Sequence, residues 1–369
     1  MPRSETPRRI VGWDIGGAHV KACLLEDGAL RDIAQWPCPL WQGLVHLDAA
    51  VALARERWPQ AWSSATIGDT ISDTLHVATM TGEMVDLFAN REEGVRQLAA
   101  TLAERLGPSL RLYAGGELAA RRWVAPQSAA LHWRLIASAN WCATAELVAA
   151  RFGDAVLVDI GSTTTDLIAV RGGRVAARGA SDAQRLASGE LVYHGVVRTP
   201  LCVLAKRVPF AGEPVNVMNE FFATTADVYR LTAELDPAHD QQATADNAGK
   251  DAAATRQRLA RMIGRDAGDA GDDEWLALAR FWRDEQRDEV AGQLARVLRS
   301  SGLPSKAPIV GAGCGDFLAA EIAGLLGRPY RRFAGDVVQL HHAADATLGR
   351  WAQVCAPAVA VAVLAAGRD

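Results

Sequence analysis

The sequence predicts an α/β protein made of two related domains with a ligand cleft between them. Two segments, residues 10–30 and 155–173, show the same pattern of strand, glycine turn and strand. Asp14 and Asp159 hold matching positions in these segments, each followed by Ile-Gly, and about one domain length of sequence separates them. That separation is far too long for a solenoid repeat. The length of 369 residues also fits two domains, at about 150 residues per domain.

Composition places the chain among ordinary globular proteins. It is 49% hydrophobic and 22% charged, which excludes disordered, collagenous and fibrous proteins. A formal net charge of -4 provides no basic field for nucleic acid or an anionic membrane. The six cysteines include no Cys-x-x-Cys pair, which argues against a zinc module and a disulfide framework. We expect a cytoplasmic protein without nucleic-acid or membrane partners, because neither a signal peptide nor a bilayer-length apolar run is evident.

Two apolar runs flank the glycine turn of the first segment. Residues 10–13 and 20–25 are the predicted strands, and the turn between them begins Asp-Ile-Gly-Gly. In a dinucleotide-binding unit such a turn opens a helix, whereas here it opens a second strand. The pattern therefore favours a hairpin whose backbone N–H groups approach a phosphate over a dinucleotide-binding fold.

The second segment repeats this hairpin and adds hydroxyl groups. Residues 156–158 and 167–170 are the predicted strands. The turn between them carries Ser162, Thr163 and Thr164, whose hydroxyls are further donors for a phosphate. The alternative for either hairpin alone is a tight turn without a ligand. Two copies at domain spacing favour the phosphate site.

A third glycine loop, residues 311–315, lies between a predicted strand and a predicted helix. Residues 308–310 form the strand, residues 317–326 the helix, and Asp316 is placed to cap that helix. This loop strengthens the prediction of a phosphate or nucleotide site. The binding candidates from the three loops are Gly16, Gly17, Ala18, Lys21, Gly161, Ser162, Thr163, Thr164, Gly311, Gly313 and Gly315.

The turn aspartates form the predicted metal site. Facing each other across a cleft, the carboxylates of Asp14 and Asp159 can hold Mg²⁺ through its bound waters. Asp166, at the end of the second loop, is a third metal candidate, and the alternative is that it caps the turn.

Shorter elements connect the two hairpins. Residues 90–107 form an amphipathic helix by their apolar spacing, with Asn90 as its N-cap. Residues 111–114 and 135–139 are predicted as short buried strands, and residues 143–152 as a second helix.

The second half of the chain contains a polar stretch, residues 236–273, which we predict to be a mobile insertion or lid with one short helix. A long helix is expected at residues 274–300. Residues 343–366 are predicted to be helical and to pack back on the first domain. The predicted boundaries are 1–152 for the first domain, completed by residues 343–369, and 153–342 for the second domain.

The order of the three loops resembles the actin, sugar-kinase and Hsp70 superfamily, in which two phosphate loops precede an adenosine loop. Lys21, seven residues after Asp14, falls where actin-like first loops carry a phosphate-contacting lysine. The resemblance implies two ribonuclease-H-like, actin-like ATPase domains flanking a central cleft. Five segments resemble, more narrowly, a hydantoinase/oxoprolinase-like group of the tetrahydromethanopterin-linked one-carbon pathway, whose archaeal relatives make the ether bond of methanofuran. These segments are residues 13–21, 79–83, 138–141, 159–166 and 218–222.

This narrower resemblance implies a Mg²⁺-dependent transferase of methylofuran or methanofuran biosynthesis. It would condense an aminomethyl-furan-methyl diphosphate with the phenol of a tyramine- or tyrosine-type acceptor and release pyrophosphate, with ATP compatible but not required. The furan ring oxygen donates electrons to the methyl carbon, so departure of pyrophosphate can precede bond formation. Loop N–H groups, Lys21 and Mg²⁺ would stabilise the charge on the leaving group.

A base is expected to take the phenol proton, because an unperturbed phenol has a pKa near 10. His19, Glu83 and Glu220 are the candidates for it, with Lys21 as the catalytic cation. The structural alternatives are a turn histidine and two ordinary exposed glutamates.

Four further residues are candidates for substrate contact: Asn140, Trp141, Arg198 and Asn219. Asn140 would orient the substrate or cap the following helix. Trp141 would stack on a furan or phenol ring or belong to the core. Arg198 would bind a carboxylate or phosphate or lie in a surface turn.

Two alternatives remain open from the sequence. One is an ATP-dependent kinase or hydantoinase-like hydrolase of the same fold, because all three loops are present. The other is a non-catalytic scaffold switched by a nucleotide. The sequence does not identify the phenolic acceptor or the oligomeric state.

Overall fold

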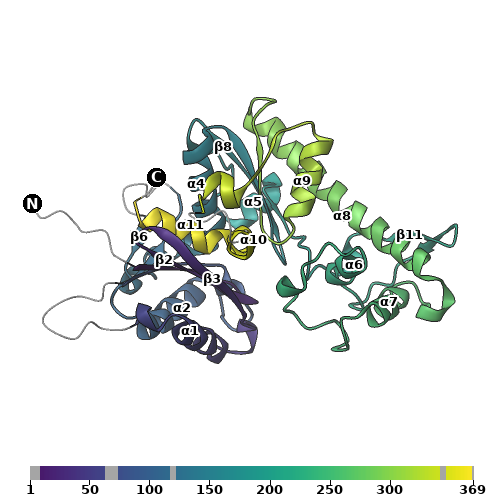
Figure 1. Cartoon of the computed structure of the whole chain (residues 1–369), viewed down its shortest axis with the longest axis horizontal. Helices are drawn as coiled ribbons and strands as arrows, with labels where there is room; N and C mark the ends of the chain where they lie inside the picture. Colours follow the sequence, from purple (N-terminus) through teal and green to yellow (C-terminus); the bar gives the residue numbers. More distant parts are fainter. Residues whose placement is uncertain (1–8, 63–73, 117–121, 341–345, 368–369) are drawn as a thin grey trace, which may run out of the picture.

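The computed structural model describes residues 9–62, 74–116, 122–340 and 346–367. Two mixed β-sheets form its centre (Figure 1). In the first sheet the strand order is β3-β2-β1-β4-β5-β6. Its strands are β1 (Arg9–Ile15), β2 (His19–Glu26), β3 (Ala29–Pro37), β4 (Thr74–Met80), β5 (Leu110–Tyr113) and β6 (Trp123–Val124).

The second sheet repeats the arrangement of the first. Its order is β10-β8-β7-β13-β14, with β9 paired to β8. In each sheet the first strand of the hairpin is antiparallel to its partner and parallel to its other neighbour, β4 for β1 and β13 for β7. The predicted two-hairpin α/β fold is therefore confirmed. The strands are β7 (Ala155–Ile160), β8 (Thr165–Arg171), β9 (Arg174–Val175), β10 (Leu191–Val192), β13 (Ile309–Ala312) and β14 (Tyr330–Arg332).

Helices cover both faces of each sheet. One continuous apolar core joins the two sheets through α4 (Asn140–Phe152) and α11 (Ala356–Ala365). The outer face of the first sheet packs on α1 (Val45–Arg57) and α2 (Arg91–Leu106). The outer face of the second sheet packs on α8 (Asp272–Ser301) and α9 (Asp316–Leu325). Burial on both faces explains why the hairpin strands are almost continuously apolar.

The C-terminal segment packs on the first sheet, as predicted. It forms two helices, α10 (Ala346–Val354) and α11, which meet at an angle of 94°. Among the described residues no single helix has the length and apolar character to cross a membrane, and only this bent pair passes that test jointly.

Close approach between β1 and α11 requires glycine at position 12. A Cβ at Gly12 would lie 2.2 Å from the carbonyl oxygen of Ala358 and 2.8 Å from Cβ of Ala362. We expect Gly12→Ala to lower the free energy of unfolding by about 1–3 kcal/mol through overpacking, measured by chemical denaturation. The matched control is Gly292→Ala in α8, where no atom lies within 4 Å of the added carbon. Equal losses in both variants would contradict this account of the contact.

Some of the predictions for the elements outside the two hairpins are confirmed and others are wrong. The helix at 90–107 is confirmed as α2, and Oδ1 of Asn90 accepts the backbone N–H of Glu93 at 2.9 Å. The strand expected at 135–139 is wrong, because the chain there turns through the short helix α3 (Trp133–Ile136). A short apolar run does not distinguish a strand from a buried helical turn. Asp316 does not cap α9; its carboxylate accepts the Tyr330 hydroxyl.

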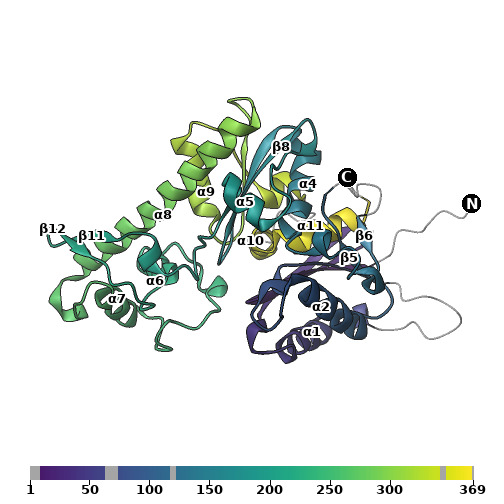
Figure 2. The ribbon, with the colours of Figure 1, turned by 180° about the vertical axis from the view of Figure 1, so that it is seen from behind.

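Residues between the second sheet and α8 form a separate lobe, seen clearly in Figure 2. The predicted helix of the polar stretch is present as α7 (Ala252–Arg261), and buried ion pairs tie the stretch to α6 (Thr225–Leu231). Arg258 pairs with Asp227 at 2.7 Å, and Arg230 pairs with Asp240 at 2.7 Å. The elements of the lobe are β11 (Arg207–Phe210), β12 (Glu213–Asn216), α6 (Thr225–Leu231), the 3₁₀ turn η6 (Pro237–His239) and α7 (Ala252–Arg261).

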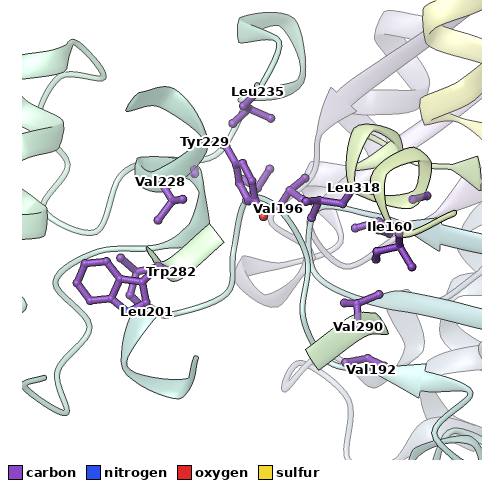
Figure 3. Packing of buried hydrophobic residues seen from close by; sticks show 14 of the residues in the cluster. Ile160, Val192, Val196, Leu201, Val228, Tyr229, Leu235, Trp282, Val290 and Leu318 are labelled. Atoms are coloured by element: carbon purple, nitrogen blue, oxygen red, sulfur yellow. The ribbon is translucent and has the colours of Figure 1, made fainter. Parts of the chain in front are cut away.

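Apolar packing joins this lobe to the second sheet (Figure 3). Tyr229 of α6 is fully buried, and its hydroxyl donates to Oε1 of Gln286 in α8 at 2.7 Å. The amide of Gln286 in turn donates to the carbonyl of Gly195 at 2.9 Å. The lobe is therefore connected to the segment that supports the second glycine loop.

Candidate active site

Strand register brings the turn aspartates to one cleft. Asp14 shares the inner face of β1 with Ile10 and Gly12, the face that packs on α11. Asp159 shares the inner face of β7 with Leu157, in the same core. Both carboxylates therefore face the space between the two sheets. A cleft of about 410 Å³ opens there.

Most of the residues predicted for the site line this cleft. They are Asp14, Gly16, Gly17, Ala18, His19, Lys21, Asn140, Asp159, Gly161, Ser162, Thr163, Thr164, Asp166 and Arg198. The predicted residues that do not line it are Glu83, Trp141, Asn219, Glu220, Gly311, Gly313 and Gly315.

The two hairpins differ in the charge opposite each aspartate. Asp14 faces Lys21 across the first hairpin, with 3.8 Å between Oδ2 and Nζ. Asp159 faces Asp166 across the second hairpin. Burial, followed by the charge of Asp166, raises the pKa of Asp159 to about 7. Burial also raises the pKa of Asp14, although Lys21 partly offsets this.

An arginine neutralises the third predicted metal ligand. The guanidinium of Arg185, in α5 (Asp182–Ser188), pairs with both Asp166 and Asp182. Asp166 is thus paired with Arg185. In contrast, Oδ1 of the buried Asp14 has no hydrogen-bond partner, and Asp159 makes no hydrogen bond among the described residues. No group of three His, Cys, Asp or Glu side chains in the described part of the chain is placed to hold a metal by itself.

The donor set nevertheless fits Mg²⁺ held partly through water. Carboxylate oxygens are the ligands that this ion prefers, and it commonly keeps several waters while binding one or two carboxylates and substrate phosphates. Asp14 and Asp159 are two such carboxylates with free oxygens, at the ends of strands beside two phosphate-sized loops.

The second loop has a cation without a carboxylate partner. Nη1 of Arg198 lies 3.4 Å from Oγ1 of Thr163, and its guanidinium faces the ring of Trp41 at 5.5 Å. No ion pair of Arg198 exists within the described residues. Burial lowers the pKa of Arg198, so the site holds a partly desolvated positive charge. Such a group is suited to an anionic ligand.

A glycine missed by sequence reasoning supports this second loop. A Cβ at Gly195 would lie 2.3 Å from the backbone nitrogen of Thr163. The carbonyl of Ser162 accepts from the backbone N–H groups of Val197 and Arg198, at 3.1 and 2.9 Å. Only the fold brings residues 195–198 beneath the loop, so no local pattern marked Gly195.

His19 is buried and uncharged. Burial, with the nearby charges of Lys21 and Arg198, lowers the pKa of His19 to about 3. Its Nε2 lies 3.1 Å from Nε2 of Gln242 in the lobe. A group with so low a pKa is a poor acceptor for a phenol proton. In this environment His19 is suited to donating a hydrogen bond to the ligand.

Glu83 lies behind the cleft wall and connects to it through Ser138. Ser138 lines the cleft, and its hydroxyl lies 2.9 Å from Oε1 of Glu83 and 3.0 Å from Oδ2 of Asp182. Oε2 of Glu83 has no partner. Burial raises the pKa of Glu83 to about 7. Ser138 has a φ of +49°, a backbone region that non-glycine residues rarely adopt. Strain of this kind clusters at functional sites.

Atoms of the protein itself fill the space beside the glycines of the third loop. A Cβ at Gly311 would lie 2.3 Å from the Tyr330 hydroxyl and 2.4 Å from Oδ1 of Asp316. A Cβ at Gly313 would lie 2.2 Å from the carbonyl of Ile160. These glycines therefore permit close packing of the loop on β7 and β14.

The remaining predicted residues lie in the core or in the lobe. Trp141 is buried, with the guanidinium of Arg185 over its ring at 4.6 Å. Asn140 begins α4, where its Oδ1 accepts the backbone N–H of Trp141 at 2.8 Å, and it also lines the cleft. Asn219 and Glu220 are exposed between β12 and α6.

Several cleft residues carried no sequence signal. Trp41 and Tyr193 line the cleft from opposite parts of the chain and are 39% and 58% exposed. Asp182 and Arg185 enter from α5. Each is an ordinary residue in its local sequence, and only the tertiary structure places it beside the loops.

Sequence comparison identified relatives of this chain. A (4-{4-[2-(gamma-L-glutamylamino)ethyl]phenoxymethyl}furan-2-yl)methanamine synthase of Methanocaldococcus jannaschii is 29% identical over 272 residues, covering 73% of this chain and 76% of that protein. A synthase of the same name from Methanococcus vannielii is 30% identical over 161 residues, covering 44% of this chain and 71% of that protein.

Solved structures show the same fold at low identity. The nucleotide-free acetone carboxylase structure matches with a TM-score of 0.50 and 10% identity, covering 96% of this chain and 70% of that one. The sequence profile described as Hydantoinase/oxoprolinase matches residues 76–331, more than half of the chain. This chain therefore belongs to the hydantoinase/oxoprolinase family.

Proposed function

We propose that this protein is a transferase that joins a furan-methyl diphosphate to a phenol through an ether bond and releases pyrophosphate. The observation that carries the proposal is its similarity to two synthases whose printed names describe a phenoxymethyl-furan product. That product consists of an aminomethyl-furan and a γ-glutamyl-tyramine joined by an ether oxygen. Its small-molecule precursors are therefore the proposed substrate classes.

The two glycine loops are the proposed diphosphate site. They lie on the same cleft, with Lys21 beside the first loop and Arg198 beside the second. Two loops rich in backbone N–H groups and two cations match a ligand with two linked phosphates. Asp14 and Asp159 would hold Mg²⁺ against the same oxygens, and the ion would neutralise charge on the leaving pyrophosphate.

The reaction needs one bond broken and one formed. The bond between the furan-methyl carbon and the diphosphate oxygen breaks, and pyrophosphate leaves with the electron pair. The phenol oxygen attacks the same carbon and gives up its proton. Lys21, Arg198 and the loop N–H groups stabilise the charge that accumulates on the leaving group, an effect that is large in a closed cleft.

Glu83 is the proposed base, acting through Ser138. Ser138 lines the cleft, and in this proposal its oxygen takes the phenol proton as its own proton passes to Glu83. The other carboxylate at this hydroxyl, Asp182, is paired with Arg91 and Arg185 and is therefore the weaker base. The raised pKa makes Glu83 a better base than an ordinary carboxylate. His19, with its low pKa, is assigned to the diphosphate instead.

Aromatic residues at the cleft mark the proposed approach of the phenol. Trp41 comes from the 3₁₀ turn η1 (Leu40–Gln42) after β3, and Tyr193 follows β10. Both rings are partly exposed. Trp41 lies near the second loop because it contacts Arg198, and Tyr193 lies near it because it follows β10. Exposed aromatic faces bind flat aromatic ligands through stacking.

A product assay tests the proposed function. The protein is incubated with aminomethyl-furan-methyl diphosphate, Mg²⁺ and a panel of tyramine and tyrosine derivatives, with and without ATP. We expect equal amounts of pyrophosphate and ether product without ATP, measured by phosphate release and mass spectrometry. ATP should not increase the rate, because the proposed reaction consumes no nucleotide. ADP formation with a product that depends on ATP would assign the cleft to kinase or hydrolase chemistry.

A further inference from the structure

A short strap from the lobe reaches across to the first sheet. We use the name strap for residues 237–242, which include η6. Asp240 anchors the strap to the lobe through two hydrogen bonds from Arg230, at 2.7 and 2.9 Å, and through Lys250. The strap therefore has a fixed place relative to α6.

Three contacts connect the strap with the first sheet and with α10, which packs on that sheet. The ring of His239 meets the ring of Trp351 edge-on at 5.0 Å. The side chains of Gln241 and Gln35 are hydrogen-bonded at 3.2 Å. Gln242 lies at the first glycine loop, where its Nε2 donates to the carbonyl of Ala18 at 3.4 Å.

The same amide nitrogen of Gln242 meets the imidazole of His19. The distance between Nε2 of Gln242 and Nε2 of His19 is 3.1 Å. An amide nitrogen only donates, so the ring nitrogen it meets must be the acceptor. The carbonyl of Ala18, which also accepts from this nitrogen, fixes the orientation of the amide group.

One consequence concerns the proton of the imidazole. A neutral histidine with an accepting Nε2 carries its hydrogen on Nδ1. Among the described residues Nδ1 of His19 has no hydrogen-bond partner, and the residue lines the cleft beside Gly16 and Gly17. Lys21 and Arg198 are the charged groups that act on His19, and both oppose its protonation.

We propose that Gln242 is a positioning residue that fixes His19 in the Nδ1–H tautomer, so that the first loop offers a neutral N–H donor to the bound anion. The identity of that anion as a diphosphate rests on the proposed function, whereas the tautomer does not. The position of the strap and the tautomer of His19 are thereby linked through one side chain.

Nitrogen NMR of ¹⁵N-histidine-labelled protein tests the tautomer directly. His19→Gln identifies the signals of His19 among those of the eight histidines. We expect Nδ1–H in the unchanged protein and a mixture of tautomers in Gln242→Ala. The matched control is Gln241→Ala, which removes the neighbouring strap contact and should keep Nδ1–H. An Nε2–H signal in the unchanged protein, or Nδ1–H retained in Gln242→Ala, would overturn the proposal.

Binding of inorganic pyrophosphate, measured by calorimetry, tests whether the tautomer of His19 affects anion binding. Gln242→Ala should weaken binding by the inverse of the fraction of His19 that remains as Nδ1–H, about threefold to fivefold, whereas Gln241→Ala should leave the affinity unchanged. Combined with His19→Gln, Gln242→Ala should cause no additional loss, because the two residues act as one unit. Equal losses in the two strap variants, or additive losses in the double variant, would contradict the assignment.

The substitution Gln242→Glu reverses the chemistry at Nε2. A carboxylate accepts only, so it favours a hydrogen on Nε2 and stabilises the imidazolium. Pyrophosphate affinity should then rise as the pH falls below neutrality, whereas the unchanged protein shows no such step from His19. Absence of this new pH dependence would count against the tautomer model. A protein that binds no pyrophosphate at all would refute the diphosphate site, while the NMR result would still decide the tautomer.

Discussion

Asp14→Asn is expected to reduce ether formation by about 10²–10³-fold. Oδ1 of Asp14 is buried without a partner at the end of β1, and the carboxylate lies 3.8 Å from Lys21. The substitution removes the negative charge that would hold Mg²⁺ and orient Lys21, while keeping the shape of the side chain. Asp159→Asn should have a similar effect from the opposite sheet.

The assay for this prediction is turnover at saturating Mg²⁺, together with the thermal midpoint of unfolding. Both variants should remain folded, because asparagine still fits the space and accepts hydrogen bonds. The control is Asp273→Asn, an exposed residue in the first turn of α8, which should keep full activity. Full activity in Asp14→Asn, or unfolding of both cleft variants, would contradict the assigned metal site.

Glu83→Gln is expected to lower kcat by about 10²–10⁴-fold, the usual contribution of a positioned base. Burial raises the pKa of Glu83 to about 7, and the base works only when it is deprotonated. The rate of the unchanged protein should therefore fall as the pH drops through about 7. In Glu83→Gln this acid limb should disappear along with most of the rate.

The pH profile of kcat between pH 5 and 9 is the measurement, at saturating concentrations of both substrates. Asp159 also has a pKa raised to about 7, but bound Mg²⁺ would lower it and remove it from this range. Glu220→Gln is the matched control, because Glu220 is exposed in the lobe and absent from the cleft lining. An acid limb that persists in Glu83→Gln would assign the base to another group.

The two hairpins could be predicted because their signals are local. Two apolar runs, a glycine turn and an aspartate lie within about twenty residues in each case, and successive side chains of a strand point to opposite faces. The N-cap of α2 was predictable for the same reason, since Asn90 and Glu93 are three residues apart.

The errors arose where a local pattern permitted two structures. Residues 135–139 form a short apolar run, which packs equally well as a helical turn against α2. Asp316 lies just before the predicted helix and thus resembles a cap, yet it is the first residue of α9 and its carboxylate accepts a hydrogen bond from Tyr330 of β14. The glycines of residues 311–315 suggested ligand contact, which stays a prediction; in the structure Gly313 and Gly315 pack closely on Ile160 of β7.

The sequence by itself determined the two-sheet α/β fold, the two phosphate-sized loops and the paired aspartates. Only the tertiary structure decided the partners of those groups: Glu83 with Ser138, Asp166 with Arg185, and His19 with Gln242 across 223 residues. The physical reason is that hairpin geometry depends on neighbouring residues. Burial, pKa and hydrogen-bond partners depend on which distant segments pack together, and no local pattern specifies that packing.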